Sequence, residues 1–563
     1  MTTKIKNQKS KIKNILGIII IIIIALFLRL YQLNSVPPSA SLDEVSIGYN
    51  AYSILKTGAD EYGYKFPLLL RAYDDWRPAL YVYLVIPFVK LFGLNVLSVR
   101  LPSVIFSVLT VISTYFLVKK LFPGTQKFSI FSSKAGQFSI GEIAAFLLAI
   151  SPWHIYISRL GHEANMGLAF FIFGITFFIY RKVYFSFIFF ALSFASYQSE
   201  KIVVPLFVLM LLILFRKELF AIKKKVIFAS IIAVIILIPF VKETTASSNA
   251  LIRFKATNVF AVQDERFIER TKLLAKAVED NNIFGKVIYN RRVLAGQIFL
   301  ENYVSHFNPN WLFFNFGNDR HKVPGLGLMY IWELPLILFG IVFLIKQKLD
   351  FKFKSLIVLW IFISPLPAAI TTDAPHAMRA YTILPIPQIL GALGILYISL
   401  FFNKRRNLIN KYYLSKISLA ILLLLISVSL VYFYKQYFFV FPKTQSASFQ
   451  YALSNAIPFV LENEKSYNKV IFSNQENLYQ SYMFFLFYNK YDPILYQKQG
   501  GTKSGGFAET HKFGKYQFEQ INKNDVQERI LYVENINEFS SKVRYQKLFS
   551  NLDNTNVIGI VAK

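Results

Sequence analysis

The sequence predicts a polytopic α-helical membrane protein with a small α/β domain at its C-terminal end. Three observations predict this class: 54% of the 563 residues are hydrophobic, the mean hydropathy is +0.42, and apolar runs recur through the first 434 residues. After Tyr434 the long apolar runs stop and the composition becomes mixed. We therefore expect a transmembrane domain at residues 1–434 and a C-terminal domain at residues 435–563.

Eleven apolar runs are expected to cross the membrane. Several are shorter than the ~20 residues that a perpendicular helix needs, so their ends should extend into the flanking sequence. The first run lacks a clear small-residue cleavage site, which favours a retained anchor over a signal peptide. The predicted spans are residues 15–30, 101–118, 143–157, 166–180, 183–197, 202–215, 226–241, 331–345, 356–370, 381–402 and 417–434.

A further apolar run, Ala79 to Gly93, decides the topology. If it lies on the outer surface as a juxtamembrane helix, the inside segments hold 25 Lys or Arg against three acids, Glu142, Glu218 and Asp350. If this run crosses the membrane, every basic loop after the first is assigned to the outside. The positive-inside rule therefore favours the juxtamembrane helix and about 11 transmembrane helices. The net charge of +30 is explained in the same way, without a nucleic-acid partner.

This topology gathers polar groups on the outer side. The first outer loop (34–100), the long outer loop (242–330), several short turns and the C-terminal domain all lie there, with all six histidines on or near this face: His154, His162, His306, His321, His376 and His511. Such one-sidedness is typical of an extracytoplasmic active site. The absence of cysteine excludes disulfides, thiolate-bound zinc and a cysteine nucleophile.

Two adjacent carboxylates, Asp43 and Glu44, follow the first span directly. A second pair, Asp74-Asp75, precedes Trp76-Arg77-Pro78 in the same outer loop. A carboxylate at this place can take a proton from an acceptor hydroxyl. Simpler interpretations stay open: Asp43 as the N-cap of a helix that begins near Val45, and Asp74-Asp75 as a solvated turn.

Cationic side chains close to the membrane come from several separate outer segments. Such groups tend to be paired or functional, although an interfacial Arg or Lys also commonly snorkels to lipid head groups. Together they indicate a site for a lipid-linked phosphate that leaves during the reaction. The sequence has no GxxxxGK[ST] and no HExxH motif. The candidate phosphate-binding residues are Arg77, Arg159, His162, Lys201, Arg320, His321, His376 and Arg379.

Several of these motifs resemble the GT-C membrane glycosyltransferases. Within that family the chain is most similar to the bacterial branch related to protein O-mannosyltransferases and to the lipid A aminoarabinose transferase. The resemblance covers about residues 15 to 400. It rests on Asp43-Glu44, Trp76-Arg-Pro-Ala-Leu-Tyr81, Val99-Arg-Leu-Pro102, Ser158-Arg-Leu-Gly-His-Glu163 and Pro375-His-Ala-Met-Arg379.

The resemblance implies a GT-C-like fold and a glycosyltransferase that uses a polyprenyl-phosphate sugar as donor. It also implies inverting transfer of the sugar at the outer face of the cytoplasmic membrane, with Asp43 as the catalytic base, Glu44 as its neighbour and Glu163 as a second catalytic acid. Relatives often have two prolines where this chain has Pro78-Ala79, which leaves a lipid, glycan or protein acceptor open. No cofactor is required; a divalent metal held by Asp43, His162 and Glu163 stays open.

A transporter or flippase of lipid-linked saccharides is the alternative function. It would place carboxylates deep in the spans, on both sides of the midplane, whereas the sequence groups them at one face. A non-catalytic scaffold leaves the clustering of acids and bases unexplained. In the C-terminal domain the residue pattern predicts strands at 470–473 and 529–534 and a helix at 478–488.

Overall fold

The structure is a computed structural model in which the chain folds into two compact units. The first contains residues 1–26, 108–157 and 167–431, and the second contains residues 27–107, 158–166 and 432–563. The residues that the structure describes are 2–73, 75–123, 128–129, 137–246, 258–259, 265–315, 321–404, 411–503, 509–521, 526–536, 538–539 and 543–563.

Every predicted span coincides with a helix. In the described residues, five helices are long and apolar enough to cross a membrane, or six if the pair α5 and α6, bent by 58°, is one span. The other predicted spans fall on shorter apolar helices, so the number of eleven stays a prediction. The helices are α1 (Thr2–Leu30), α4 (Val96–Leu121), α5 (Ile140–Ile150), α6 (Pro152–Ser158), α7 (Glu163–Ile179), α8 (Val183–Phe194), α9 (Glu200–Leu214), α11 (Lys223–Ala246), α17 (Glu333–Lys346), α18 (Phe351–Ile363), α19 (Leu366–Ala369), α20 (Ile386–Lys404) and α21 (Lys411–Lys435).

Within the first unit, helix ends that were predicted to lie on the same side of the membrane meet. Near the expected outer side, the Trp153 indole donates to the Ala377 carbonyl over 3.0 Å, and the Tyr330 hydroxyl donates to the Ile150 carbonyl over 3.1 Å. On the expected inner side, Lys352 of α18 pairs with Glu218 of the short helix α10 (Arg216–Ala221). The sidedness of these helix ends stays a prediction from charge.

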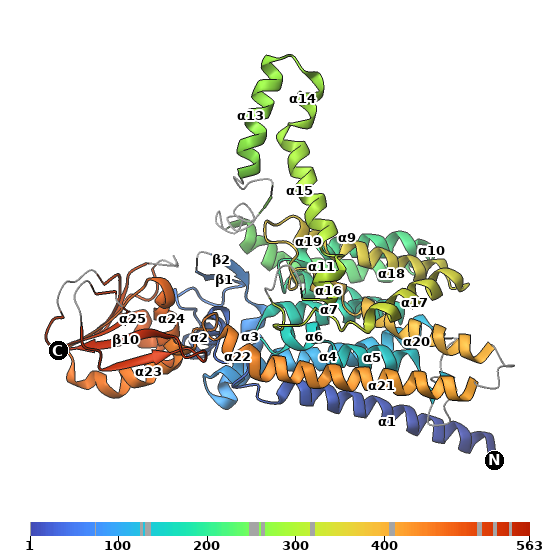
Figure 1. Ribbon diagram of the computed structural model, residues 1–563, viewed down its shortest axis with the longest axis horizontal. Helices are drawn as coiled ribbons and strands as arrows, with labels where there is room; N and C mark the ends of the chain where they lie inside the picture. The colour runs from blue at the N-terminus through green and yellow to red at the C-terminus, as the bar shows by residue number, and fades with distance from the viewer. Residues whose placement is uncertain are drawn as a thin grey trace. The chain divides into compact units, whose positions relative to one another are not determined.

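The long outer loop contains a helical hairpin. Figure 1 shows α13 (Glu265–Glu279) and α15 (Arg291–Ser305) side by side as a hairpin, with α14 (Ile283–Ile288) near its tip. The two long helices share a small core of buried residues: Val259, Phe267, Leu294, Ala295 and Ile298. The last turns of α15 are fixed by Asn302, whose side-chain amide donates to the Thr371 carbonyl over 3.0 Å.

The topology can be tested by labelling single cysteines, because the chain has none of its own. Lys65→Cys in the first outer loop should react with a membrane-impermeant maleimide from outside, and Lys224→Cys at the start of α11 only from inside. Both side chains are exposed, so neither result depends on local opening. Labelling of Lys224→Cys from outside would contradict the positive-inside assignment.

In the second unit, the first outer loop folds into α2 (Leu42–Thr57), the hairpin of β1 (Leu69–Ala72) and β2 (Asp75–Pro78), and α3 (Leu80–Phe92). Ser41 and Glu44 begin α2 through a capping box, in which each side chain accepts a bond from the other's backbone N–H. Gly58 ends the helix in the left-handed conformation, with φ of 70°. The Ala79–Gly93 run is therefore helical; its placement on the membrane surface stays a prediction.

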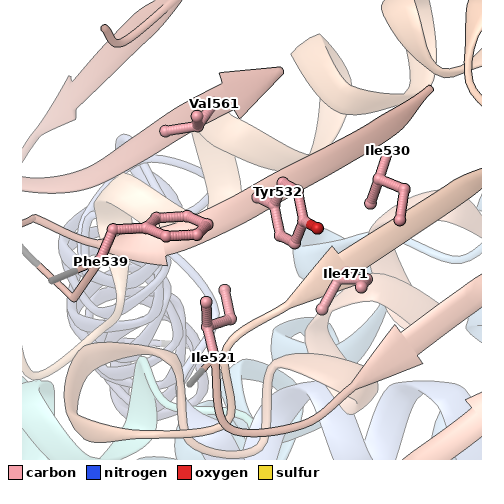
Figure 2. Close-up of a cluster of buried hydrophobic side chains, with 6 residues drawn as sticks. All are labelled: Ile471, Ile521, Ile530, Tyr532, Phe539 and Val561. Carbon is pink, nitrogen blue, oxygen red and sulfur yellow. The ribbon is translucent and has the colours of Figure 1, made fainter. Parts of the chain in front are cut away.

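The C-terminal segment forms a mixed six-stranded sheet in the order β6-β7-β5-β8-β10-β9. β5 is parallel to β7 and β8, and the other neighbours are antiparallel. One side of the sheet packs the apolar cluster in Figure 2, which includes Ile471 and Tyr532. The predicted strands and the predicted helix are present. The elements are β5 (Lys469–Phe472), β6 (His511–Phe513), β7 (Tyr516–Phe518), β8 (Ile530–Asn535), β9 (Lys547–Ser550), β10 (Asn556–Ala562), α23 (Tyr451–Asn463), α24 (Ser481–Asn489) and α25 (Pro493–Lys498).

The C-terminal segment is joined to the first outer loop through the buried side chain of Glu61. Its carboxyl group accepts bonds from Asn50 of α2 over 3.1 Å, from the Thr502 hydroxyl over 2.8 Å and from the Tyr482 hydroxyl over 3.3 Å. Burial raises the pKa of Glu61 to about 7, although the bonds from Asn50 and Thr502 oppose the shift. Glu61 therefore titrates near neutral pH in the folded protein.

This shift predicts how stability changes with pH. The folded pKa of Glu61 is about 7, against the ordinary 4.5, so between these values the folded state holds a proton that the unfolded state has lost. Its contribution is complete below the unfolded pKa and falls by about 3 kcal/mol as pH rises from 4.5 to 7. Glu61→Gln should remove this dependence. Thermal unfolding of both proteins across this range measures it, and parallel curves would contradict it.

Candidate active site

Asp43 lies in the first turn of α2 with its side chain 47% exposed. Ser41 is the N-cap, so the capping function that was open for Asp43 belongs to Ser41 and Glu44 instead. A carboxylate in the first turn of a helix is favoured by the positive end of the helix dipole. Asp43 is thus an accessible acid beside a fixed helix terminus.

Three less exposed side chains surround Asp43. Arg77 of β2 donates from Nη2 to Oδ1 of Asp43 over 2.9 Å, and Nε2 of His162 lies 3.9 Å from Oδ2. On the other side of the imidazole ring, Nδ1 lies 3.6 Å from Oε2 of Glu163. Arg77, His162 and Glu163 are only 7%, 13% and 6% exposed. We call these four residues the acid–base cluster.

The backbone indicates which nitrogen of His162 carries the proton. Nδ1 of His162 accepts the backbone N–H of Ala164 over 3.1 Å, so in the neutral ring the proton is assigned to Nε2. That N–H faces the Asp43 carboxylate. The turn from Arg159 to Glu163 therefore orients the imidazole toward the acid on α2.

The charges of the acid–base cluster are complementary. Burial by itself would lower the pKa of the Arg77 guanidinium, but Asp43 and Glu163 outweigh it and raise the pKa above its ordinary value. Arg77 therefore remains charged and favours the ionised form of Asp43. The cluster can accept a proton at Asp43 and bind an anionic group at Arg77 and His162.

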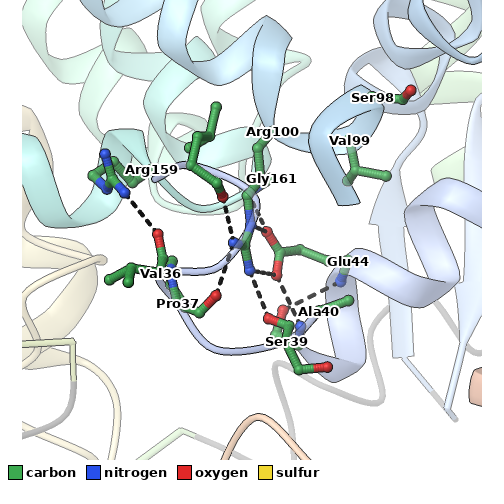
Figure 3. A network of polar contacts seen from close by, with 12 residues as sticks. Val36, Pro37, Ser39, Ala40, Glu44, Ser98, Val99, Arg100, Arg159 and Gly161 are labelled. Atoms are coloured by element: carbon green, nitrogen blue, oxygen red, sulfur yellow. Dashed lines mark hydrogen bonds and ion pairs between the residues drawn. The ribbon is translucent and has the colours of Figure 1, made fainter. Parts of the chain in front are cut away.

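Glu44 is buried in a different network, shown in Figure 3. Its Oε1 accepts bonds from Nε of Arg100 over 2.7 Å and from the backbone N–H of Gly161 over 2.8 Å; its Oε2 accepts bonds from Nη2 of Arg100 over 3.1 Å and from the N–H of Ser41 over 2.8 Å. Burial would raise the pKa of Glu44, but Arg100 and these bonds together lower it. Glu44 is an ionised carboxylate whose two oxygens are fully occupied.

Arg100 completes this network. Its Nη1 donates to the Leu33 and Pro37 carbonyls over 2.8 and 3.1 Å, and its Nη2 donates to the Ser39 carbonyl over 2.6 Å. All five N–H groups of a guanidinium thus have acceptors. The pair ties the end of the first span, the start of α2 and the start of α4 together.

Arg159 is buried as well, and it binds backbone rather than solvent (Figure 3). It donates to the Leu28 and Arg29 carbonyls over 3.1 and 2.9 Å and to the Val36 carbonyl over 2.8 Å. Tyr437 and Phe438 cover its guanidinium, with ring centroids 5.3 and 5.1 Å away. The positive charge therefore neutralises carbonyls at the end of α1.

The remaining predicted residues belong to the first unit. The rings of His321 and His376 lie 5.2 Å apart, Nε2 of His376 lies 3.7 Å from Asp373, and Arg379 donates to the Thr371 hydroxyl over 2.7 Å. Lys201 is the second residue of α9. Arg320 and Asp74 lie outside the described residues. The structure thus brings together His321, His376 and Arg379, and separately Asp43, Arg77, His162 and Glu163.

A divalent metal held by Asp43, His162 and Glu163 stays a prediction. Among the described residues, no group of three or more His, Asp or Glu side chains is placed to hold a metal ion. Nε2 of His162 lies 3.9 Å from Oδ2 of Asp43, and Nδ1 accepts the backbone N–H of Ala164 over 3.1 Å.

Two buried residues that hold the structure together, Arg100 and His306, were given no role in the sequence analysis. Arg100 was named only as part of the Val99-Arg-Leu-Pro102 motif. An arginine at the start of an apolar span is expected to be paired, and this expectation could have identified Arg100 from the sequence. His306 accepts the His376 N–H at Nε2 over 3.1 Å, and its Nδ1 lies 2.7 Å from the Asn302 carbonyl. Burial lowers the pKa of His306 to about 4, so it is a neutral support for His376.

No protein-family model and no curated protein matches this chain. Among solved structures, the chain is similar to ArnT from Cupriavidus metallidurans bound to undecaprenyl phosphate, with a TM-score of 0.49, 10% identity, and coverage of 96% of this chain and 97% of that one. It is also similar to the apo oligosaccharyltransferase of Archaeoglobus fulgidus, with a TM-score of 0.47, 13% identity, and coverage of 84% of this chain.

Both are GT-C glycosyltransferases. A second structure of the archaeal enzyme, AglB in complex with an inhibitory peptide and a dolichol-phosphate, gives a TM-score of 0.47 and 14% identity. This chain spans only 64% of the archaeal protein's length. The sequence motifs resemble the same family.

Proposed function

We propose that this protein is a glycosyltransferase of the cytoplasmic membrane that moves a sugar from a polyprenyl-phosphate donor to an acceptor on the outer face. The acid–base cluster carries this proposal. It combines one exposed carboxylate, Asp43, with a cation and an imidazole that are held in place at less exposed positions. A proton acceptor beside donors for an anion is what displacement of a lipid phosphate by a hydroxyl requires.

In the proposed reaction, the acceptor hydroxyl oxygen attacks the anomeric carbon of the donor sugar. Asp43 takes the hydroxyl proton as the new carbon–oxygen bond forms. The bond between the anomeric carbon and the phosphate oxygen breaks, and polyprenyl phosphate leaves with the electron pair. The sugar is already activated by its bond to the lipid phosphate, so no nucleotide is needed.

We propose that Arg77 and His162 hold the Asp43 carboxylate in place and stabilise its charge during this step. Arg77 holds Asp43 in place at 2.9 Å and favours its ionised form before the reaction. Nε2–H of His162 faces the same carboxylate, and Oε2 of Glu163 lies 3.6 Å from Nδ1 on the other side of the ring. We assign Glu163 a positioning role, because its carboxylate contacts the imidazole rather than the exposed surface.

Glu44 and Arg159 are proposed to position the site rather than to contact substrate. The oxygens of Glu44 are occupied by Arg100 and backbone N–H groups, and the guanidinium of Arg159 is occupied by backbone carbonyls and covered by two rings. Both hold the turn before α7 against the first outer loop. This assignment replaces the catalytic role considered for Glu44 and the phosphate-binding role considered for Arg159.

Donor binding by the second group of residues stays a prediction with its own test. His321→Gln and Arg379→Gln should each weaken binding of a polyprenyl-phosphate sugar, because truncating one partner of a charge-assisted contact typically costs about 2 to 5 kcal/mol. Arg266→Gln, on the exposed hairpin, is the matched control and should bind as the parent does. Unchanged donor affinity in both test variants would remove these residues from the donor site.

The function itself is tested by incubating the purified protein with a panel of labelled polyprenyl-phosphate sugars. Release of polyprenyl phosphate in the presence of membrane or cell-wall extracts is the expected result. The panel identifies the sugar, and fractionating the labelled product as lipid, glycan or protein identifies the acceptor. Movement of an intact lipid-linked sugar across sealed vesicles, with no release of phosphate, would support the flippase alternative instead.

A further inference from the structure

A cavity in the first unit lies where several helix ends meet. It has a volume of about 680 Å³, within the ~300–1,000 Å³ of typical ligand sites. Its walls come from the ends of α4, α7 and α9, the turn before α8, the short helix α10 and the start of α18. By the charge-based topology, all of these segments lie at the inner membrane boundary.

The wall of the cavity has two chemical parts. Three cations, Lys120, Arg181 and Lys352, contribute to the lining, together with two acids, Glu218 and Asp350. The rest of the lining is mostly apolar and includes Phe178, Ile179, Val183, Phe215, Leu219, Ile222 and Phe353. A cavity wall with a charged part beside an aromatic and aliphatic part is suited to an amphiphilic ligand, which has a polar head group and an apolar tail.

The two acids are already engaged within the protein. Glu218 pairs with Lys352, and the Asp350 side chain caps α18 by accepting the backbone N–H of Lys352 over 2.9 Å. Lys120 lies over the ring of Tyr180, 5.6 Å from its centroid. Because Lys352 neutralises Glu218, the charges that remain at the cavity are those of Lys120, Arg181 and the helix-capping Asp350, which leaves one positive charge in excess.

Arg181 has an unusual backbone. It follows α7 with φ of 59°, and the N–H groups of Arg181 and Lys182 close the helix by donating to the Phe178 and Phe177 carbonyls, both over 2.8 Å. Glycine is the usual residue at this position of such a helix end, since a side chain there is strained. Strained residues of this kind cluster at functional and ligand-binding sites, which makes the Arg181 side chain a candidate ligand contact.

We propose that this cavity binds an anionic glycerophospholipid of the inner leaflet, with its phosphate between Lys120 and Arg181 and its acyl chains along the apolar wall. Basic pockets between membrane helices on the cytoplasmic side are a common form of lipid head-group site. A free inorganic phosphate would share the cations but would leave the apolar wall without a partner. The combination favours the lipid.

The proposal is tested with the full-length protein in detergent, using native mass spectrometry and added phosphatidylglycerol. Arg181→Gly should lower phosphatidylglycerol occupancy roughly tenfold, as expected for loss of one charge-assisted contact, and should raise the unfolding temperature because the strain at that position is removed. Lys120→Gln should also lower occupancy, without the gain in stability. A loss of binding accompanied by a gain in stability separates a ligand contact from a structural role.

Lys224→Gln is the matched control, since Lys224 is exposed on the same predicted face but does not line the cavity. It should bind phosphatidylglycerol as the parent does. The proposal is overturned if both cavity variants keep parental occupancy, if Lys224→Gln loses as much, or if phosphatidylcholine binds equally well. Displacement of phosphatidylglycerol by an equal concentration of inorganic phosphate would overturn it in favour of a solute site.

Discussion

Replacing Asp43 with asparagine is expected to lower the turnover of sugar transfer by about 10²- to 10⁴-fold, the usual contribution of a general base. Asparagine keeps the shape of the side chain and still offers an oxygen to Nη2 of Arg77, but it cannot take the acceptor's proton. The capping of α2 is untouched, because Ser41 and Glu44 perform it. Donor binding and the unfolding temperature should therefore change little.

Asp492→Asn provides the matched control for this variant. Asp492 begins α25 by accepting two backbone N–H groups, and asparagine caps a helix as well as aspartate does. It is an aspartate at a helix start in the same unit, without Arg77 or His162 around it, and its variant should retain full turnover. A folded Asp43→Asn protein with near-parental turnover would remove Asp43 as the base and make Glu163 the next candidate.

The largest effect on stability is expected at Glu44. Glu44→Ala leaves the buried guanidinium of Arg100 without its carboxylate, and breaking a buried ion pair in this way typically costs about 3 to 5 kcal/mol. Turnover per folded molecule should fall far less than for Asp43→Asn, since Glu44 does not face the substrate. Thermal unfolding in detergent, measured beside the transfer assay, separates the two effects.

A double-mutant cycle sharpens this prediction. Arg100→Met alone leaves Glu44 buried and unpaired, so it should also be strongly destabilising. The double variant Glu44→Met with Arg100→Met removes both charges and should recover part of the loss, because well-packed apolar residues often replace a buried pair with little cost. Additive losses in the double variant would show that the two residues act through other partners.

The sequence predicted the helices well and the pairing of their polar residues poorly. Long apolar runs report burial in lipid directly, and so each predicted span falls on a helix. The residue pattern by itself does not distinguish Asp43 from Glu44, because adjacent residues on a helix point in different directions and only the fold brings Arg100 and Gly161 to one of them. Only the family resemblance assigned the base to Asp43 and made Glu44 its neighbour.

The same reasoning explains why two of the predicted phosphate-binding arginines, Arg77 and Arg159, have different surroundings in the structure. Arg77 and Arg159 look alike in sequence, as arginines close to a membrane boundary. One lies against an exposed carboxylate, while the other is enclosed by the carbonyls at the end of α1 and by two aromatic rings. Chain segments more than a hundred residues apart create this difference, as with Arg159 and the Arg29 carbonyl, so local composition does not encode it.

The contacts between α2 and the C-terminal segment have a consequence for biosynthesis. Gly48 of α2 lies so close to the ring of Phe487 that a methyl group there would come within 2.4 Å of it, and the Ser39 hydroxyl bonds that of Tyr488, 449 residues later in the chain. The packing partner of the helix that carries Asp43 is therefore synthesised more than 400 residues after the helix itself. A nascent chain holds an incomplete site until Phe487 and Tyr488 have been made, and activity should appear only after that point.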